Sequence, residues 1–167
     1  MTPSTTLSPP TITLVTGGSR GLGRNTALSI ARDGGDVIIT YRSQAEEAQA
    51  AVAEIQALGR RAVALQLDTG NIAAFVTFTE HLRAALQTTW QRTDLDHLVN
   101  NAGHGDFAAF ATTSEAQFDH LVNVHFKGVF FLTQALLPLI ADGGRIVNFS
   151  TGLTRLSLPG YAAYAAA

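Results

Sequence analysis

Apolar residues recur along the chain in two alternating patterns. Short runs of β-branched and apolar residues predict five strands, at residues 11–16, 36–41, 62–67, 95–99 and 145–149. Apolar positions with helical spacing predict four helices between them, at residues 21–33, 43–58, 71–88 and 114–139. Glycines mark the ends of two of these helices, at Gly34 and Gly59. Strands that alternate with helices indicate βαβ units with right-handed crossovers.

The expected fold is therefore α/β: a Rossmann-like three-layer α/β/α arrangement around a doubly wound parallel sheet with strand order 3-2-1-4-5. Neither an internal repeat nor a linker interrupts residues 11–167, which we expect to form one domain. Residues 1–10 are rich in Thr, Ser and Pro, which predicts a disordered tail and not a signal or transit peptide. Residues 151–167 predict a loop and the first turn of a further helix. Because such a sheet normally continues, we expect its later strands to be missing from this chain.

Composition excludes several classes of function. Of 167 residues only 14% are charged, and 11 basic against 13 acidic residues give a net charge of −2, which argues against a nucleic-acid partner. The absence of Cys removes disulfides, Cys-zinc sites and thiol nucleophiles. No two of the five His are spaced i, i+4, so no metal site is predicted. The longest apolar stretch, residues 121–140, contains too many polar residues to span a membrane, and we expect a cytoplasmic protein.

The first predicted strand and helix are joined by a glycine-rich turn. Gly17, Gly21 and Gly23 follow the strand with the spacing Gly-x3-Gly-x-Gly. Glycines there allow a tight turn and the close approach of a pyrophosphate to free amides at the helix N-terminus. Because Arg24 and Asn25 follow Gly23, the Gly-Lys-Ser/Thr ending of an ATP-binding P-loop is absent. The turn predicts a dinucleotide site, in which the backbone and side chains of Ser19, Arg20 and Leu22 take part. The alternative interpretation is a glycine-rich βα turn that binds no ligand.

The end of the second predicted strand bears on the choice of nucleotide. A site for NAD places an acidic residue there, to hold the ribose hydroxyls. This strand instead ends in Tyr41, Arg42 and Ser43, and the nearest acid, Asp36, lies at its opposite end. Arg42 together with Arg20 could hold a 2′-phosphate, which a carboxylate would repel. We therefore predict NADP in preference to NAD. The alternative interpretation of Arg42 is a solvated surface cation that binds no nucleotide.

Two further loops follow strands at the same predicted edge of the sheet. Asp68 and Thr69 end the third strand, where Asp68 could accept a hydrogen bond from an adenine amino group or could cap the next helix. After the fourth strand, Asn100 can fix neighbouring backbone, while Ala102 and Gly103 leave room for a flat ligand. These loops complete the predicted cofactor-binding set.

Four motifs in this order closely resemble the short-chain dehydrogenase/reductase family. They are TGGSRGLG at residues 16–23, NNAG at residues 100–103, HFKG at residues 125–128 and PGYAAY at residues 159–164. The resemblance extends over nearly the whole chain from Thr11. It implies reversible hydride transfer between NADP and a small-molecule carbonyl or alcohol.

The resemblance also implies a catalytic tyrosine with a hydroxyl residue about 13 positions before it. Tyr164 meets that condition with Thr151, whereas the position 13 before Tyr161 is Asn148, so Tyr161 is expected to pack the loop. Thr151 stands where the family usually has Ser, and Ser150 takes its place if the loop is shifted by one residue. These side chains are expected to hold and protonate the substrate oxygen.

Two departures from the family pattern affect the expected activity. His125 occupies the position three before Gly128 where the family usually has Asn; it could serve the proton relay in altered form or be a buried structural His. Asn123 cannot replace it, because two residues along a helix rotate a side chain by about 200°. The lysine that the family has four residues after the tyrosine would follow Ala167. Since a nearby cation lowers the pKa of a tyrosine, we expect the chain alone to be nearly inactive.

Two functions of different classes follow from these residues. The first is an NADP-dependent oxidoreductase, which could pair with a second copy through the apolar long helix. The second is a non-enzymatic nucleotide-binding or protein-pairing module, because the fifth strand would present an apolar edge. A truncated chain without function remains a third alternative.

Overall fold

Five short strands form the centre of the molecule: β1 (Ile12–Val15), β2 (Asp36–Tyr41), β3 (Ala62–Gln66), β4 (Leu95–Asn100) and β5 (Ile140–Asn148). The computed structural model describes residues 10–167, so the predicted tail lies outside the described residues except for Pro10. All four strand pairs are parallel and the order is β3-β2-β1-β4-β5, which confirms the predicted topology.

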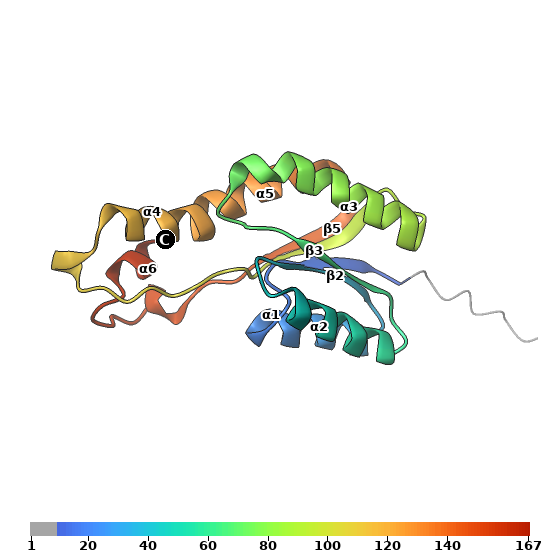
Figure 1. Ribbon diagram of the computed structural model, residues 1–167, viewed down its shortest axis with the longest axis horizontal. Coiled ribbons are helices and arrows are strands. Elements are labelled where there is room, and N and C mark those ends of the chain that lie inside the picture. Colours follow the sequence, from blue (N-terminus) through green and yellow to red (C-terminus); the bar gives the residue numbers. More distant parts are fainter. Residues whose placement is uncertain (1–9) are drawn as a thin grey trace, which may run out of the picture.

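Helices cover both faces of this sheet (Figure 1). α1 (Gly21–Arg32) and α2 (Ala45–Ala57) lie on one face, and α3 (Phe75–Trp90) and α5 (Val129–Leu136) lie on the other. Successive side chains of β1 lie on opposite faces of the sheet. Leu14 belongs to the core between the sheet and helices α3 and α5, and Val15 belongs to the core between the sheet and helices α1 and α2. Burial on both faces explains why the strands are almost continuously apolar.

The predicted long helix at residues 114–139 is not one regular helix. It begins as predicted at Ser114, whose side chain forms a capping box with Gln117, and runs as α4 (Glu115–Val122). A π-helical segment, Asn123–Gly128, then separates α4 from α5, and a short 3-10 turn, Leu137–Leu139, ends the run. At Gly128 the helix presses on the loop after β3, where a Cβ would overlap the carbonyl oxygen of Thr69. Helical periodicity alone does not reveal this wider turn.

The prediction for the fifth strand was wrong at its start. β5 begins at Ile140, five residues before the predicted start, and its pairing with β4 is irregular: Leu95 lies opposite Ile140, whereas His97 lies opposite Arg145. Gly143, with φ +81°, allows the chain to turn inside this irregular stretch. Beyond it, Ile146, Val147 and Phe149 remain 39–48% exposed along the outer edge of the sheet.

Buried charge is concentrated at the amino ends of the strands. The Asp36 carboxylate is fully buried and accepts hydrogen bonds from the side chains of Arg60, Arg61 and Trp90. Burial by itself raises the pKa of Asp36, but the backbone N–H of Arg61 and these side chains together hold it below its usual value. Asp36 is therefore committed to structure, away from the carboxyl ends where a ligand would bind.

The chain extends beyond the carboxyl end of the sheet as an arm (Figure 1). α4 and the short helix α6 (Ala162–Ala166) lie side by side there, connected to the sheet by the loops that follow β4 and β5. Among the described residues, no helix combines the length and apolar character needed to cross a bilayer.

Candidate functional site

A cleft of about 640 Å³ opens at the carboxyl ends of the strands, where ligands of open α/β sheets bind. Every candidate site residue from the sequence lines it, on seven segments of the chain. Those residues are Gly17, Ser19, Arg20, Gly21, Leu22, Gly23, Arg42, Ser43, Asp68, Thr69, Asn100, Ala102, Gly103, His125, Ser150, Thr151 and Tyr164. The volume is in the range of small-molecule sites.

The glycine turn forms the floor at one end of the cleft, which we call the glycine-turn end (residues 17–23 and 40–43). Gly17 and Gly21 have φ values of +65° and +57°, a conformation that L side chains rarely adopt. Gly23 is needed for a different reason: a Cβ there would overlap the carbonyl oxygen of Gly17 and the side-chain amide nitrogen of Asn101. Within residues 10–167 no side chain caps the N-terminus of α1 at Arg20, so its first amides remain available to a ligand anion.

Polar contacts fix this turn to the core. The Thr16 hydroxyl oxygen accepts hydrogen bonds from the backbone N–H groups of Asn101 and Ala102, each at 2.9 Å. The Asn101 side-chain amide donates back to the carbonyl oxygens of Thr16 and Gly17. On the other side, the Gly17 N–H donates to the Thr40 hydroxyl at 3.1 Å. The loops after β1 and β4 and the carboxyl end of β2 are therefore joined to one another.

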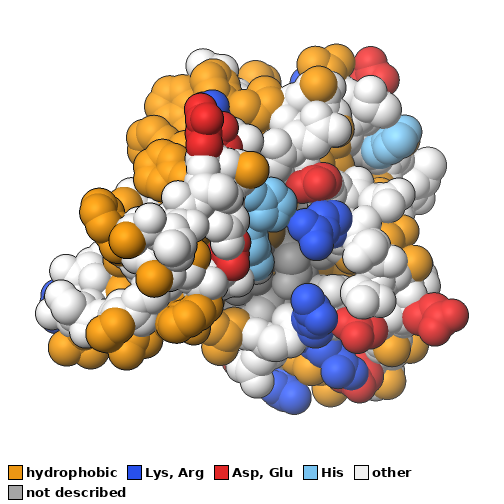
Figure 2. Space-filling model, turned by 60° about the vertical axis from the view of Figure 1, so that its left-hand side comes forward, with side chains coloured by type: hydrophobic (Ala, Val, Ile, Leu, Met, Phe, Trp, Pro, Cys, Tyr) orange, Lys and Arg blue, Asp and Glu red, His pale blue; other side chains and the backbone are white. Residues whose placement is uncertain are grey.

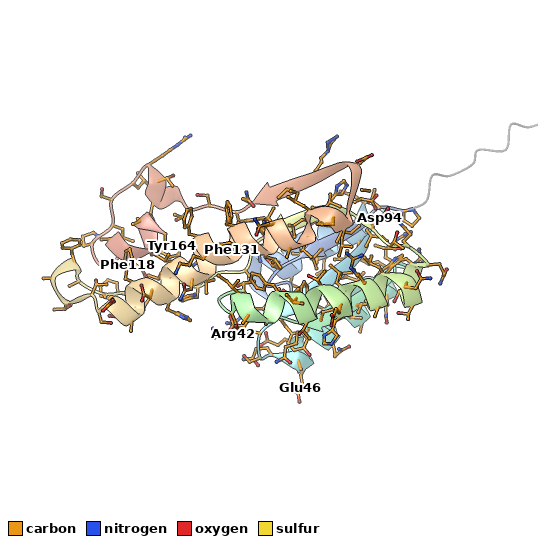
Figure 3. The ribbon with its side chains drawn as sticks, turned by 90° about the horizontal axis from the view of Figure 1, so that it is seen from above. Arg42, Glu46, Asp94, Phe118, Phe131 and Tyr164 are labelled. Atoms are coloured by element: carbon orange, nitrogen blue, oxygen red, sulfur yellow. The ribbon has the colours of Figure 1, made fainter. Side chains whose placement is uncertain are left out.

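Positive charge borders the glycine-turn end. Arg20 and Arg42 both line the cleft and are exposed, and Figure 3 shows Arg42 toward the same end of the sheet as Tyr164, away from Asp94. The Gln66 side chain donates to the Arg42 carbonyl oxygen at 2.9 Å and so fixes the backbone there. In the described part of the chain, Asp68 is the one carboxylate that lines the cleft. The arrangement suits an anion near Arg42.

Two of the predicted cofactor residues are already engaged in structure. One oxygen of Asp68 accepts a hydrogen bond from the Gly70 N–H at 2.9 Å, within its own loop. Asp68 does not cap the next helix, because the N-cap residues there are Asn71 and Ala74 and, in the described chain, neither helical segment has a side-chain cap. The Asn100 amide donates to the Thr133 hydroxyl and to the Asn148 side-chain oxygen, which joins β4 to α5 and β5. Asn100 is almost fully buried, so its side chain supports the cleft wall.

The other end of the cleft, which we call the Tyr164 end (residues 103–107, His125 and residues 150–164), is built from side-chain contacts. The rings of Tyr164 and His125 meet edge to face, with centroids 5.3 Å apart and planes at 90°. The Thr151 hydroxyl oxygen accepts a hydrogen bond from the Leu153 N–H at 3.3 Å, which leaves its own hydrogen free to donate. Asn123 does not line the cleft, whereas His125 does.

His104 is a cleft residue that the sequence did not indicate. Nε2 of His125 lies 2.7 Å from the His104 carbonyl oxygen and 3.3 Å from the His104 backbone nitrogen, so according to its tautomer it donates to the carbonyl or accepts from the N–H. The centroid of the His104 ring lies 4.3 Å from that of His120 and 5.4 Å from that of His125. No spacing in the sequence predicted this cluster, because the loop after β4 and the helices bring the three residues together.

Burial and like charge both act on His104. Burial lowers its pKa, the nearby His120, His125 and Arg42 lower it further, and Asp106 acts in the opposite direction. Figure 2 shows His side chains in the hollow beside Lys and Arg side chains, with hydrophobic side chains gathered on the left of the view. Among residues 10–167 no group of His and acidic side chains has the geometry to hold a metal ion.

Comparisons with known proteins agree with this architecture. Residues 11–167 match the family model described as short chain dehydrogenase. The chain is 34% identical over 155 residues to a hydroxynaphthalene reductase of Aspergillus fumigatus, a match that covers 92% of the chain and 54% of that protein.

Solved structures show the same similarity. The landomycin C-6 ketoreductase LanV with bound NADP and rabelomycin superposes with a TM-score of 0.90 at 35% identity, over 93% of this chain and 64% of that one. A short chain dehydrogenase from Burkholderia cenocepacia in complex with NADP gives a TM-score of 0.84 at 40% identity, over 93% and 62%. The chain thus spans between half and two thirds of the length of these relatives.

Proposed function

The chain belongs to the short-chain dehydrogenase family, and on that basis we propose that it binds NADP and serves hydride transfer between the nicotinamide and a carbonyl or alcohol. The cleft supports this proposal, because at least one residue of each of the four family motifs lines it at one edge of the sheet. The NADP named with two of the similar structures supports the choice of nucleotide.

The observation that carries the proposal is the charge at the glycine-turn end. Arg20 and Arg42 flank the turn, and β2 ends without a carboxylate, while Asp36 is held at the opposite end of that strand by Arg60 and Arg61. A 2′-phosphate gains charge-assisted hydrogen bonds from guanidinium groups, whereas ribose hydroxyls are better served by an acid. The residues present therefore fit NADP better than NAD.

The glycine turn fits the pyrophosphate of the same molecule. Its uncapped helix N-terminus provides amide donors and the positive end of the helix dipole. Positive φ at Gly17 and Gly21 turns the backbone toward the cleft without a Cβ in the way. Asp68, with one carboxylate oxygen not used by Gly70, is proposed to accept a hydrogen bond from the adenine amino group.

At the Tyr164 end we propose roles for four side chains. The bound cofactor supplies or accepts the hydride, and the protein moves the proton. In reduction the Tyr164 hydroxyl donates its proton to the substrate oxygen, which the Thr151 hydroxyl also hydrogen-bonds; Ser150 is the neighbouring alternative. His125, held at Nε2 by the backbone of His104, is proposed to pass a proton to the site through its imidazole ring.

Lys127, the only lysine of the sequence, does not line the cleft. No cationic amine therefore assists Tyr164 in the described residues, and we expect residues 1–167 alone to reduce ketones slowly.

Exposed apolar surface supports a second proposal, pairing with another chain. Phe118, Phe126, Phe130 and Phe131 along α4, the π-helical segment and α5 are 39–64% exposed, and so are parts of the β5 edge. Surfaces of this kind mark interfaces. We propose a homo-oligomer formed through the long helical run, in a cytoplasmic protein that acts on small molecules.

Calorimetry with NADP and NAD on residues 1–167 tests the proposal. We expect NADP to bind more tightly, and Arg42→Ala to lower the affinity for NADP by about 10- to 100-fold, the value of one or two hydrogen bonds to a charged group. The same variant should change NAD binding little, because NAD lacks the 2′-phosphate.

Arg60→Ala is not a suitable control, because it would leave the buried Asp36 short of a partner. Arg32→Ala, at the last turn of α1 and away from the cleft, removes the same charge from the protein without that cost. Equal affinities for NADP and NAD, or an equal loss in Arg32→Ala and Arg42→Ala, would contradict the proposal.

A further inference from the structure

The backbone that follows β2 is fixed by a side chain of the neighbouring strand. Tyr41, the last residue of β2, lies opposite Gln66 of β3, and its carbonyl oxygen accepts a hydrogen bond from the Leu67 N–H at 2.9 Å. Arg42 comes next, and its carbonyl oxygen accepts a hydrogen bond from the Gln66 side-chain amide at 2.9 Å. Gln66 therefore holds the first residue beyond the end of β2.

The position of the Arg42 side chain depends on this backbone. Arg42 lines the cleft and is exposed, and within residues 10–167 no hydrogen bond or ion pair fixes its guanidinium group. Residues 42–44 connect β2 to α2, and the N-cap residue Gln44 makes no side-chain cap there. The guanidinium group is thus available to a ligand, while its place along the cleft is set by the chain that carries it.

The same end of β2 is also joined to the glycine turn. The Gly17 N–H donates to the Thr40 hydroxyl at 3.1 Å, and the Gly18 N–H donates to the Thr40 carbonyl oxygen at 2.9 Å. Thr40 is buried, so water competes little for these contacts. The backbone from Thr40 to Arg42 is therefore held from two sides, by the glycine turn and by Gln66.

We propose that Gln66 is a positioning residue for nucleotide selectivity, which holds Arg42 where its guanidinium group meets the 2′-phosphate of NADP. The inference rests on the proposed function, because it takes NADP to lie in the cleft with its pyrophosphate at the glycine turn. Covalent bonds limit the distance between these two groups of the nucleotide, so Arg42 must lie at a matching distance from the turn. Gln66 is not among the residues that line the cleft, and it acts through Arg42.

Pre-organisation explains why this contact favours one nucleotide. A guanidinium group that is already in place binds a phosphate more tightly than one that must first be ordered, because binding then costs less conformational entropy. NAD lacks the 2′-phosphate and gains nothing from the position of Arg42. The Gln66 hydrogen bond therefore adds to the preference for NADP, beyond the charge of Arg42 itself.

Calorimetry with NADP and NAD on residues 1–167 and on Gln66→Met tests this inference. Methionine has nearly the length of glutamine but lacks the amide that donates to Arg42. We expect Gln66→Met to weaken NADP binding about 3- to 10-fold, the value of one neutral hydrogen bond, and to leave NAD binding unchanged. In chains that carry Arg42→Ala, the same substitution should no longer change NADP binding, because its effect passes through the Arg42 side chain.

Gln87→Met is the matched control, since Gln87 is an exposed residue of α3 that does not line the cleft. It should leave both affinities unchanged. The inference would be overturned by an unchanged NADP affinity in Gln66→Met, by an equal loss for NADP and NAD, by the same loss in the presence of Arg42→Ala, or by an equal effect of Gln87→Met. Failure of the unsubstituted chain to bind NADP more tightly than NAD would instead overturn the proposed function.

Discussion

The two ends of the cleft are held in position by different kinds of contact. At the glycine-turn end, the loops after β1 and β4 and the carboxyl end of β2 are joined by hydrogen bonds through Thr16, Thr40 and Asn101. At the Tyr164 end, two loops and the π-helical segment meet mainly through rings, and Tyr164 is placed by packing against His125 and Tyr161. Directional contacts within the sheet fix one end, and side-chain packing on the arm shapes the other.

This difference matches the tasks that we propose for the two ends. A nucleotide phosphate needs donors at fixed positions, which a backbone turn provides at no cost in side-chain entropy. A substrate pocket needs shape and apolar surface, which loops can vary while the sheet stays unchanged. Substitutions at the two ends should therefore differ in how far their effects extend.

Gly23→Ala gives the largest expected effect. Its Cβ would overlap the backbone of Gly17 in the turn and the side chain of Asn101 in the loop after β4, so we expect a loss of roughly 3 kcal/mol in the free energy of unfolding. NADP affinity should fall by at least about 100-fold, because the phosphate-binding turn must move. Chemical denaturation and calorimetry measure the two quantities.

The matched variant at the Tyr164 end is Gly105→Ala, where the nearest atom to the new Cβ is 3.9 Å away. We expect a stability change within about 0.5 kcal/mol there. If Gly105→Ala destabilises the protein as much as Gly23→Ala does, the proposed difference between the two ends is wrong.

Gly103→Ala should have an intermediate and local effect. Its Cβ would lie 2.6 Å from Cε1 of His125, so the imidazole must move away from the His104 carbonyl. We expect a loss of about 1–2 kcal/mol and a change in the NMR signals of the His125 ring. Binding of adenosine bisphosphate, which reports on the glycine-turn end alone, should stay the same. Unchanged NMR signals of the His125 ring in Gly103→Ala would show that the ring does not pack against Gly103.

The smallest expected effect is a pH dependence at His104. Its pKa is lowered in the folded protein, so the folded state binds fewer protons than the unfolded state as the pH falls. Stability from this residue is present above the unfolded pKa, about 6.5, and is lost as the pH falls from there through the lower pKa of the folded state. Thermal unfolding between about pH 7.5 and pH 5 should show a falling midpoint that His104→Phe makes flatter.

The titration of Asp36 and Asp96 does not contribute to the change in stability between about pH 7.5 and pH 5. The pKa values of Asp36 and Asp96 are also lowered, but their contribution is present above about pH 3.9 and is lost only as the pH falls through the folded values. A slope that is the same in His104→Phe would assign the effect to another histidine.

Sequence predicted most of the glycine-turn end because its requirements are local. Gly17, Gly21 and Gly23 follow a strand and precede a helix, and their spacing is set by one tight turn. The absence of an acid after β2 could likewise be seen in three consecutive residues. The strand order followed from alternating periodicity and the handedness of crossovers.

The Tyr164 end was predicted less completely because its contacts join distant parts of the chain. His104 and His120 lie far apart in sequence from Tyr164, and only the loop after β4 and the course of α4 bring them near it. Phe107 meets Tyr161 across more than fifty residues, which no local pattern records. The early start of β5 was missed because Gly143, with its positive φ, and the irregular pairing with β4 lie between Ile140 and the predicted start of the strand.

The wide turn at Asn123–Gly128 sets the rotational phase between the two parts of the long helical run. The buried positions Val124, Gly128, Leu132 and Leu136 are spaced by four, and in a regular α-helix each such step drifts about 40° around the axis. A stretch with more residues per turn cancels part of that drift, so Leu121 in α4 and Leu136 in α5 can both face inward. Exchange of the outward side chains Phe126 and Lys127 would leave this phase intact, whereas deletion of a single residue in the segment would turn one half of the run away from its partner surface.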